Sequence, residues 1–317
     1  MKVKKNKLLS IVVPIFNEYE SIPETFNRLN KVCHDFKKTY QVSTEIIFVD
    51  DGSSDNSMDL LSAIAVRNKF VKIISFTRNF GHQFSVTAGI DESRGDYIGI
   101  IDGDLQDPPE LIIDMYKLAK EGFDVVYAVR SSRKGESYFK KITASLFYRF
   151  FNFMCNESIP RDTGDFRLIS RKVADEFRLL KERHRFIRGL IPWLGHKSAP
   201  IYYNRAERFA GITKYPLRKM IDFATNAIFS FSVKPLKLTI RLGLSIIFLS
   251  ILLSAYILYL RYLKNILIPG FAAITLAIVF FGGVNIFLIG LVGEYISRIF
   301  EEVKDRPLYV VDKKINF

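Results

Sequence analysis

Five short apolar runs separated by four helix-like stretches occupy about the first 130 positions of this 317-residue chain. The runs lack the alternation of polar residues that a strand with one solvated face would show, so we expect strands buried on both faces. The expected strands are 9–15, 45–49, 71–76, 97–101 and 124–129, and the expected helices are 22–36, 56–67, 82–92 and 110–121. This order predicts an α/β domain with a mainly parallel sheet and helices on both faces. In such sheets the ligand binds at the carboxyl ends of the strands.

The fourth expected strand runs directly into a cluster of carboxylates. Asp102, Asp104 and Asp107 follow it, and the pair Pro108-Pro109 then opens a helix. Carboxylates at one strand end repel one another and raise each other's pKa unless a cation lies among them. Oxygen ligands suit a hard ion such as Mg2+ or Mn2+, which takes its remaining ligands from water and substrate phosphates. The pattern therefore predicts a metal–diphosphate site.

Polar residues also follow the second and third expected strands. Asp50 and Asp51 are adjacent, which exceeds what a helix cap needs, so we expect one to accept hydrogen bonds from a ribose or a base. Arg78 could face phosphates or the base. His82 has no metal-ligating partner at a usual spacing, and we interpret it as a polar residue at a helix start.

The basic segment after the fifth expected strand leaves two interpretations open. Residues 129–137 include Arg130, Arg133 and Ser137. They could form a solvated loop, or they could clamp a phosphomonoester, because arginine forks and hydroxyl donors suit that group.

Two later segments carry further candidates. Asp165 comes immediately before a short expected strand and is the best candidate for a residue that faces an acceptor substrate. Asp162 is interpreted as a turn residue. A polar loop that contains Arg205 and Arg208 could fold over a pyrophosphate. The chain contains neither G-x-G-x-x-G after its first strand nor G-x-x-x-x-G-K-[ST], so a glycine cradle for the phosphates is not expected.

Two apolar segments near the C-terminus are each long enough to cross a bilayer. Residues 242–260 hold about 19 uncharged positions and residues 265–293 about 29, against a hydrocarbon core of roughly 30 Å. The stretch 214–233 is amphipathic, as in helices that lie in the membrane surface. Basic residues flank the pair of segments and are sparse between them, which predicts a hairpin with both chain ends in the cytoplasm. Attraction of these basic residues to anionic lipid explains much of the formal net charge of +13 without a nucleic acid partner.

Four motifs, in this order, resemble those of family 2 glycosyltransferases. They are Pro14-Ile15-Phe16-Asn17-Glu18, Asp50-Asp51-Gly52-Ser53, Asp102-Gly103-Asp104-Leu105-Gln106 and Asp162-Thr163-Gly164-Asp165-Phe166-Arg167. With the C-terminal hairpin, the chain is similar over nearly its whole length to the polyprenyl-phosphate hexosyltransferases, the branch that includes dolichol-phosphate mannose synthase and bactoprenol glucosyltransferase. The Q-x-x-R-W motif of processive relatives is absent, and residues 185–190 stand in its place, which argues against a polymerising synthase.

The resemblance implies a GT-A fold for residues 1–213 as a cytoplasmic catalytic domain. Residues 214–234 would then form an amphipathic juxtamembrane helix, 235–297 two transmembrane helices, and 298–317 a cytoplasmic tail.

The resemblance also implies roles for individual residues. Asp102, Asp104 and Gln106 would hold Mg2+ or Mn2+, and Asp102, Asp104 and Asp165 would serve in catalysis. The nucleotide sugar would contact Pro14, Asn17, Glu18, Asp50, Asp51, Arg78, Asp102 and Gly103, and the acceptor phosphate would contact Arg130, Arg133, Ser137, Arg205 and Arg208. Whether Asp165 is a base or only orients the acceptor stays open.

The activity implied is the inverting transfer of a hexose to a polyprenyl (undecaprenyl) phosphate at the cytoplasmic face of the plasma membrane. Glucose from UDP-glucose is our first choice, because bactoprenol glucosyltransferases carry such a hairpin. GDP-mannose, UDP-galactose or an N-acetylhexosamine donor, and an inactive membrane scaffold, stay open as alternatives, as does a homo-oligomer.

Overall fold

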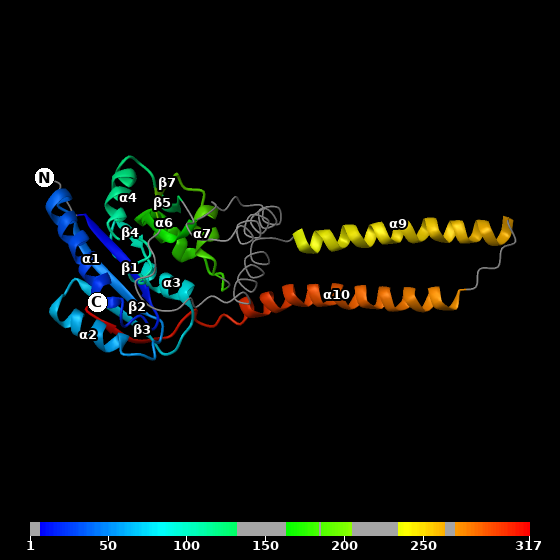
Figure 1. Ribbon diagram of the computed structural model, residues 1–317, viewed down its shortest axis with the longest axis horizontal. Coiled ribbons are helices and arrows are strands. Elements are labelled where there is room, and N and C mark those ends of the chain that lie inside the picture. Colours follow the sequence, from blue (N-terminus) through cyan, green and yellow to red (C-terminus); the bar gives the residue numbers. More distant parts are fainter. Residues whose placement is uncertain (1–6, 132–162, 184, 205–233, 264–269) are drawn as a thin grey trace. The chain divides into compact units, whose positions relative to one another are not determined.

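The computed structural model describes residues 7–131, 163–183, 185–204, 234–263 and 270–317 (Figure 1). Two compact units are present. The first contains the described residues up to 204 together with Arg306–Phe317, and the second contains two long helices. The expected amphipathic stretch 214–233 lies outside the described residues.

An eight-stranded sheet in the order β7-β5-β6-β4-β1-β2-β3-β8 forms the centre of the first unit. The strands are β1 (Leu8–Ile15), β2 (Ser43–Asp50), β3 (Val71–Phe76), β4 (Tyr97–Ile100), β5 (Val125–Arg130), β6 (Thr163–Ser170), β7 (Ser198–Tyr203) and β8 (Val311–Ile315). Neighbours are parallel from β3 through β2 and β1 to β4, and again between β5 and β7. Strands β6 and β8 run antiparallel to their neighbours. The mainly parallel sheet and its five expected strands are confirmed.

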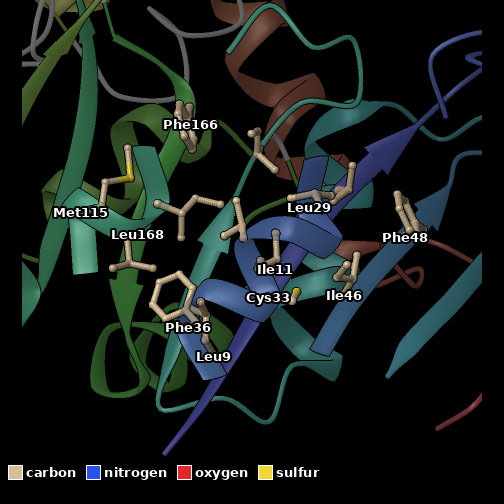
Figure 2. Close-up of a cluster of buried hydrophobic side chains, with 14 of the residues drawn as sticks. Leu9, Ile11, Leu29, Cys33, Phe36, Ile46, Phe48, Met115, Phe166 and Leu168 are labelled. Carbon is tan, nitrogen blue, oxygen red and sulfur yellow. The ribbon is translucent and has the colours of Figure 1, made fainter. Parts of the chain in front are cut away.

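Helices cover both faces of this sheet. They are α1 (Ile22–Asp35), which continues into the π-helical turn η1 (Phe36–Tyr40), α2 (Ser57–Arg67), α3 (His82–Glu92), α4 (Leu111–Lys120), α6 (Arg171–Leu179) and α7 (Ile187–Trp193). On one face α1, α2 and α4 pack on the main hydrophobic cluster, in which Ile11, Phe36 and Met115 are fully buried (Figure 2). Because successive strand residues point to opposite faces, Val12 faces the other side, where α3 packs against β1.

The reversal of strand order lies at β1. This strand pairs in parallel with β2 on one side and with β4 on the other. A switch of this kind opens a crevice beyond the carboxyl ends of the two strands, which is where ligands bind in open α/β sheets. The end of β1 and the loop after β4 are closely packed there, because a Cβ on Gly103 would lie 2.5 Å from Ile15 Cδ1 and 3.2 Å from the Pro14 carbonyl oxygen.

The C-terminal segment differs from the expected tail at 298–317. Helix α10 (Phe271–Val303) continues past residue 298, and β8 then adds an antiparallel strand to the edge of the sheet beside β3. Strand β8 carries Asp312, Lys313 and Lys314. Charged residues are common on edge strands, which face solvent on one side, so the apolar pattern of the buried strands does not extend to β8.

The second unit consists of α9 (Lys234–Leu263) and α10. Both helices are long and apolar enough to cross a membrane, with the best windows at Lys234–Leu253 and Phe280–Val303 and mean hydropathies of 2.0 and 1.5. Apart from Pro235, no residue in these two ranges whose side chain the structure describes is buried. The expected spans differ somewhat: 242–260 lies inside α9, whereas 265–293 begins before α10 and ends ten residues short of Val303.

Candidate active site

The predicted metal-binding motif forms one turn after β4. Asp104 is 8% exposed, and its Oδ1 accepts a hydrogen bond of 3.2 Å from the backbone N–H of Gln106. Leu105, between them, has a φ of +59°. This left-handed residue folds the loop back on itself, so that Asp102, Asp104 and Gln106 belong to a single tight turn.

Asp102 lies opposite a histidine from the start of α3. Its Oδ1 is 3.5 Å from His82 Nε2 and accepts no hydrogen bond from the described residues. The pKa of Asp102 is raised to about 6. Burial is the main cause of the rise, the charge of His82 opposes it, and the nearby carboxylates of Asp165, Asp107 and Asp104 add to it. An added cation would stabilise the ionised form of this carboxylate.

Asp165 lies inside β6, two residues after its first residue, rather than before the strand as expected. It is 2% exposed, and Arg188 of α7 binds both its oxygens, with Nε 3.0 Å from Oδ1 and Nη2 2.9 Å from Oδ2. His82 Nε2 lies 3.2 Å from Oδ2, and the Gln83 side chain donates a weaker bond of 3.4 Å. Although burial alone would raise the pKa of Asp165, Arg188 and His82 together hold it well below its usual range. Asp165 is therefore an ionised, firmly held carboxylate.

Sequence reasoning missed His82, Gln83 and Arg188 as members of this cluster. His82 does begin α3, as expected, but its ring also bridges Asp102 and Asp165. Burial lowers the pKa of His82, but these two carboxylates outweigh that effect and raise it to about 9. The position of His82 in the sequence could have indicated this role. His82 follows β3, and the carboxyl ends of the parallel strands β3 and β4 lie at the same edge of the sheet.

Asp50 supports the loop between β2 and α2. It is 2% exposed, and it accepts hydrogen bonds from the Ser53 N–H at 3.3 Å and from the Ser75 hydroxyl at 3.1 Å. The Asp50 carboxylate thus connects the ends of β2 and β3.

Asp51 supports the loop after β3. Its carboxylate accepts the backbone N–H groups of Phe80 at 2.7 Å and Gly81 at 2.9 Å. Burial raises the pKa of Asp51, and these hydrogen bonds oppose the rise.

Arg78, in the same loop after β3, lies 4.2 Å from the centre of the Phe80 ring. A Cβ on Gly52, which has a φ of +66°, would lie 2.4 Å from the Arg78 carbonyl carbon, so the two loops touch through backbone.

Asn17 and Glu18 fasten the end of β1 to the loop before α2. The Asn17 N–H donates to the Ser53 hydroxyl at 2.9 Å, and its side-chain oxygen accepts the Ser54 N–H at 2.8 Å. Asn17 has a φ of +52°, a conformation that asparagine tolerates better than most residues. The Glu18 N–H donates to Ser57 Oγ at 3.2 Å.

Arg130 is the only predicted acceptor-phosphate residue that the described part of the chain contains. It ends β5, and its Nε donates to the Tyr203 hydroxyl at 3.4 Å. A Cβ on Gly164, which precedes Asp165, would lie 3.1 Å from Arg130 Nη2, so the guanidinium lies beside the Asp165 strand. Arg133, Ser137, Arg205 and Arg208 lie outside the described residues.

The donor set of the acid loop fits a hard divalent cation. Among the described residues no group of three or more His, Cys, Asp or Glu side chains is arranged to hold a metal. Mg2+ does not require such a group, because it commonly binds through one or two carboxylates and takes its other ligands from water and substrate phosphates. The buried Oδ1 of Asp102, which accepts no hydrogen bond from the described residues, and Asp104 two residues later meet that need.

The family model described as Glycosyl transferase family 2 matches residues 10–178. This chain is 48% identical to the uncharacterized glycosyltransferase YkcC of Bacillus subtilis (strain 168), over 96% of this chain and 93% of that protein. The chain therefore belongs to glycosyl transferase family 2, and its mainly parallel sheet with helices on both faces is the GT-A fold.

Further matches include the two candidate membrane helices. A second family model, described as GtrB C-terminal hairpin, matches residues 234–299. The bactoprenol glucosyl transferase of Shigella phage SfV is 38% identical, over 96% of this chain and 97% of that protein. Among solved structures, glucosyl-3-phosphoglycerate synthase from Mycobacterium tuberculosis aligns with a TM-score of 0.47 at 18% identity, over 71% of this chain and 78% of that chain.

Proposed function

We propose that this chain transfers glucose from UDP-glucose to polyprenyl (undecaprenyl) phosphate, with inversion at the anomeric carbon. The observation that carries the proposal is the similarity to proteins named bactoprenol glucosyl transferase over 96% of the chain, hairpin included. The placement of an acid loop at the sheet's switch point supports the donor half of the proposal.

In the donor half, Asp102, Asp104 and Gln106 would hold Mg2+ or Mn2+. Such a cation would offset the negative charge of the departing diphosphate. Asp50 or Asp51 would contact the nucleoside. Because both carboxylates already accept hydrogen bonds from the protein, their remaining lone pairs and the loops they hold would form that contact.

In the acceptor half, a phosphate oxygen of the lipid attacks the anomeric carbon. The new carbon–oxygen bond forms as the bond to the diphosphate breaks, and the bonding electron pair leaves with UDP. A phosphomonoester has its second pKa near 6 and is largely dianionic at pH 7, so the nucleophile needs no strong general base. We assign Asp165 an orienting and electrostatic role, because Arg188 and His82 already occupy its oxygens.

The membrane part would keep the lipid acceptor within reach. We propose that α9 and α10 cross the plasma membrane as a hairpin, with the catalytic domain and both chain ends in the cytoplasm. Lys234, Lys237 and Arg241 precede the first apolar segment, and Arg298, Lys304 and Arg306 follow the second. Basic residues of this kind are retained on the cytoplasmic side.

The proposal is tested with the purified full-length chain in detergent or in lipid nanodiscs. UDP-glucose, undecaprenyl phosphate and Mg2+ or Mn2+ are added, and released UDP and the mass of the lipid product are measured. We expect one hexose per lipid phosphate and no polymer. A different mass gain in a panel of donor sugars would replace glucose, and no product with any donor would support the inactive scaffold.

Asp104→Asn tests the metal site. Asparagine keeps a side-chain oxygen for the Gln106 N–H, so the turn should survive, but the charge is lost. We expect transfer to fall at least about 100-fold, because metal stabilisation of the leaving group contributes several kcal/mol. Asp114→Asn is the matched control, since Asp114 is an exposed acid paired with Lys117 on α4. Full activity in Asp104→Asn would contradict the assignment.

A further inference from the structure

Tyr203, the last residue of β7, lies between two loops of the proposed site. It is 7% exposed, and its hydroxyl donates a short hydrogen bond to Asp107 Oδ1. The same hydroxyl accepts the 3.4 Å hydrogen bond from Arg130 Nε. Its ring packs edge-on against Phe166 of β6, with centroids 6.2 Å apart. One phenol therefore connects β5, β6 and the loop after β4.

Asp107 belongs to the loop of the predicted metal ligands. It follows Gln106 directly, and its side chain is fully buried. A hydroxyl that donates to a buried carboxyl oxygen satisfies a polar atom that water cannot reach. The Tyr203 hydroxyl is thus fixed to the donor loop.

Arg130 is confined from two sides. Tyr203 contacts its Nε, and its Nη2 occupies the space over Gly164, where a Cβ would lie only 3.1 Å away. An arginine held in one position loses less conformational freedom when it binds an anion than one that is free to move. The contact with Tyr203 therefore prepares Arg130 for a ligand.

We infer that Tyr203 is a positioning residue, which holds Arg130 at a fixed place relative to the Asp102–Asp107 loop through its hydrogen bond to Asp107. The inference rests on the proposed function and on the expectation from the sequence that Arg130 binds the acceptor phosphate. Tyr203 then sets the distance between the acceptor phosphate and the donor diphosphate, although it touches neither substrate.

Tyr203→Phe removes the hydroxyl and keeps the ring that packs on Phe166. We expect the KM for undecaprenyl phosphate to rise about fivefold, the effect of one lost hydrogen bond. The KM for UDP-glucose should stay within about twofold of the wild-type value. Tyr203→Phe removes one contact of Asp107 but leaves the hydrogen bond between Asp104 and the Gln106 N–H that closes the donor turn. Tyr202→Phe is the matched control: it removes a hydroxyl from the neighbouring residue of β7, which is 67% exposed, and should change neither constant.

A double-mutant cycle separates positioning from a general loss of structure. Arg130→Ala alone should raise the acceptor KM, and adding Tyr203→Phe to it should raise that KM by less than about twofold, because the residue through which Tyr203 acts is gone. Additive effects, an equal rise in the donor KM, or an unchanged acceptor KM in Tyr203→Phe would overturn the inference. Absence of any transfer by the wild-type chain would instead remove the proposed function, and this inference with it.

Discussion

The Asp165 carboxylate has cationic side chains on both of its oxygens, so its contribution to the site depends on them. Arg188→Ala would leave this buried carboxylate without its two-point partner. Breaking a buried pair costs about 3–5 kcal/mol, and we expect the lower end because the Arg188 side chain is 30% exposed. We predict a lower thermal unfolding temperature and a kcat reduced at least about tenfold.

Arg188→Lys is the comparison for this prediction. Lysine keeps the positive charge but lacks the planar fork that binds both carboxylate oxygens. Its unfolding temperature and kcat should lie between those of the wild-type chain and Arg188→Ala. Equal activity in all three proteins would show that the pair has no part in transfer.

A second buried pair, Glu45–Lys72, makes stability depend on pH. The carboxylate of Glu45 is 2.7 Å from Lys72 Nζ and also accepts from the Ser10 hydroxyl and the Arg94 N–H. Burial alone would raise the pKa of Glu45, but these partners outweigh it and lower the pKa below the usual 4.5. A lowered pKa stabilises the fold above the unfolded-state value, and that contribution is lost as pH falls through the folded-state value. We therefore expect the unfolding temperature to drop as pH falls below about 4.5.

Glu45→Gln isolates this effect. The variant should be less stable than the wild-type chain at pH 7 by about 3 kcal/mol, because Lys72 is left buried without its partner. The difference in unfolding temperature between the two proteins should then shrink from pH 5 to pH 3. Parallel pH curves would show that Glu45 does not titrate differently in the folded state.

The strands and helices were predictable from the sequence wherever the strands are buried on both faces of the sheet, because such strands have continuous apolar sequences. This holds for β1 to β5 and for the helices between them, and it also placed Asp102 and Asp104 at a strand end. It fails for β8, an edge strand with three charged residues, and for the start of β6, where Asp165 lies inside the strand. The contact of Arg188 with Asp165 could not be predicted from the sequence either, because it depends on how α7 packs on β6.

The packing of α3 on β1 leaves no space at Gly89. A Cβ there would lie 2.1 Å from Val12 Cγ1, and a β-branched side chain in a strand has little freedom to move aside. We expect Gly89→Ala to destabilise the protein by about 1–3 kcal/mol, as overpacking does, despite alanine's better helix propensity.

Shortening the Val12 side chain should relieve the overpacking that Gly89→Ala introduces. Val12→Ala alone should destabilise by leaving a cavity, but the double variant Val12→Ala/Gly89→Ala should be more stable than the sum of the two single effects predicts. Thermal unfolding of the four proteins measures the coupling. Additive changes would show that the helix shifts instead.

Across the whole molecule, the segment after α10 belongs to the sheet that carries the candidate site. Strand β8 pairs with β3, and the Thr77 N–H donates to the Val310 carbonyl at 3.1 Å. Tyr309 stacks on Phe76 with ring centroids 5.0 Å apart, and its hydroxyl donates to Asp91 at 3.0 Å. The chain thus leaves a candidate membrane helix and then completes the edge of the catalytic sheet.

This edge supports the loop that Asp51 holds. Phe76 also packs edge-on against Phe80, with centroids 5.7 Å apart, and the Phe80 N–H donates to Asp51. A disturbance at Tyr309 would therefore reach the proposed nucleoside contact through two aromatic rings. The acid loop after β4 and Arg130 lie on other strands and would be less affected.

Tyr309→Ala should accordingly weaken donor binding more than acceptor binding. We expect the affinity for UDP, measured by calorimetry on the purified full-length chain with Mn2+ present, to fall about tenfold, because the stacked ring and its hydrogen bond are both lost. Tyr309→Phe keeps the stack and should lose only about two- to fivefold. Lys314→Ala is the control on β8: its exposed ion pair with Glu92 contributes little, so UDP affinity should not change. If all three variants bound UDP as the wild-type chain does, β8 would serve stability alone, and the loop after β3 would hold its shape without it.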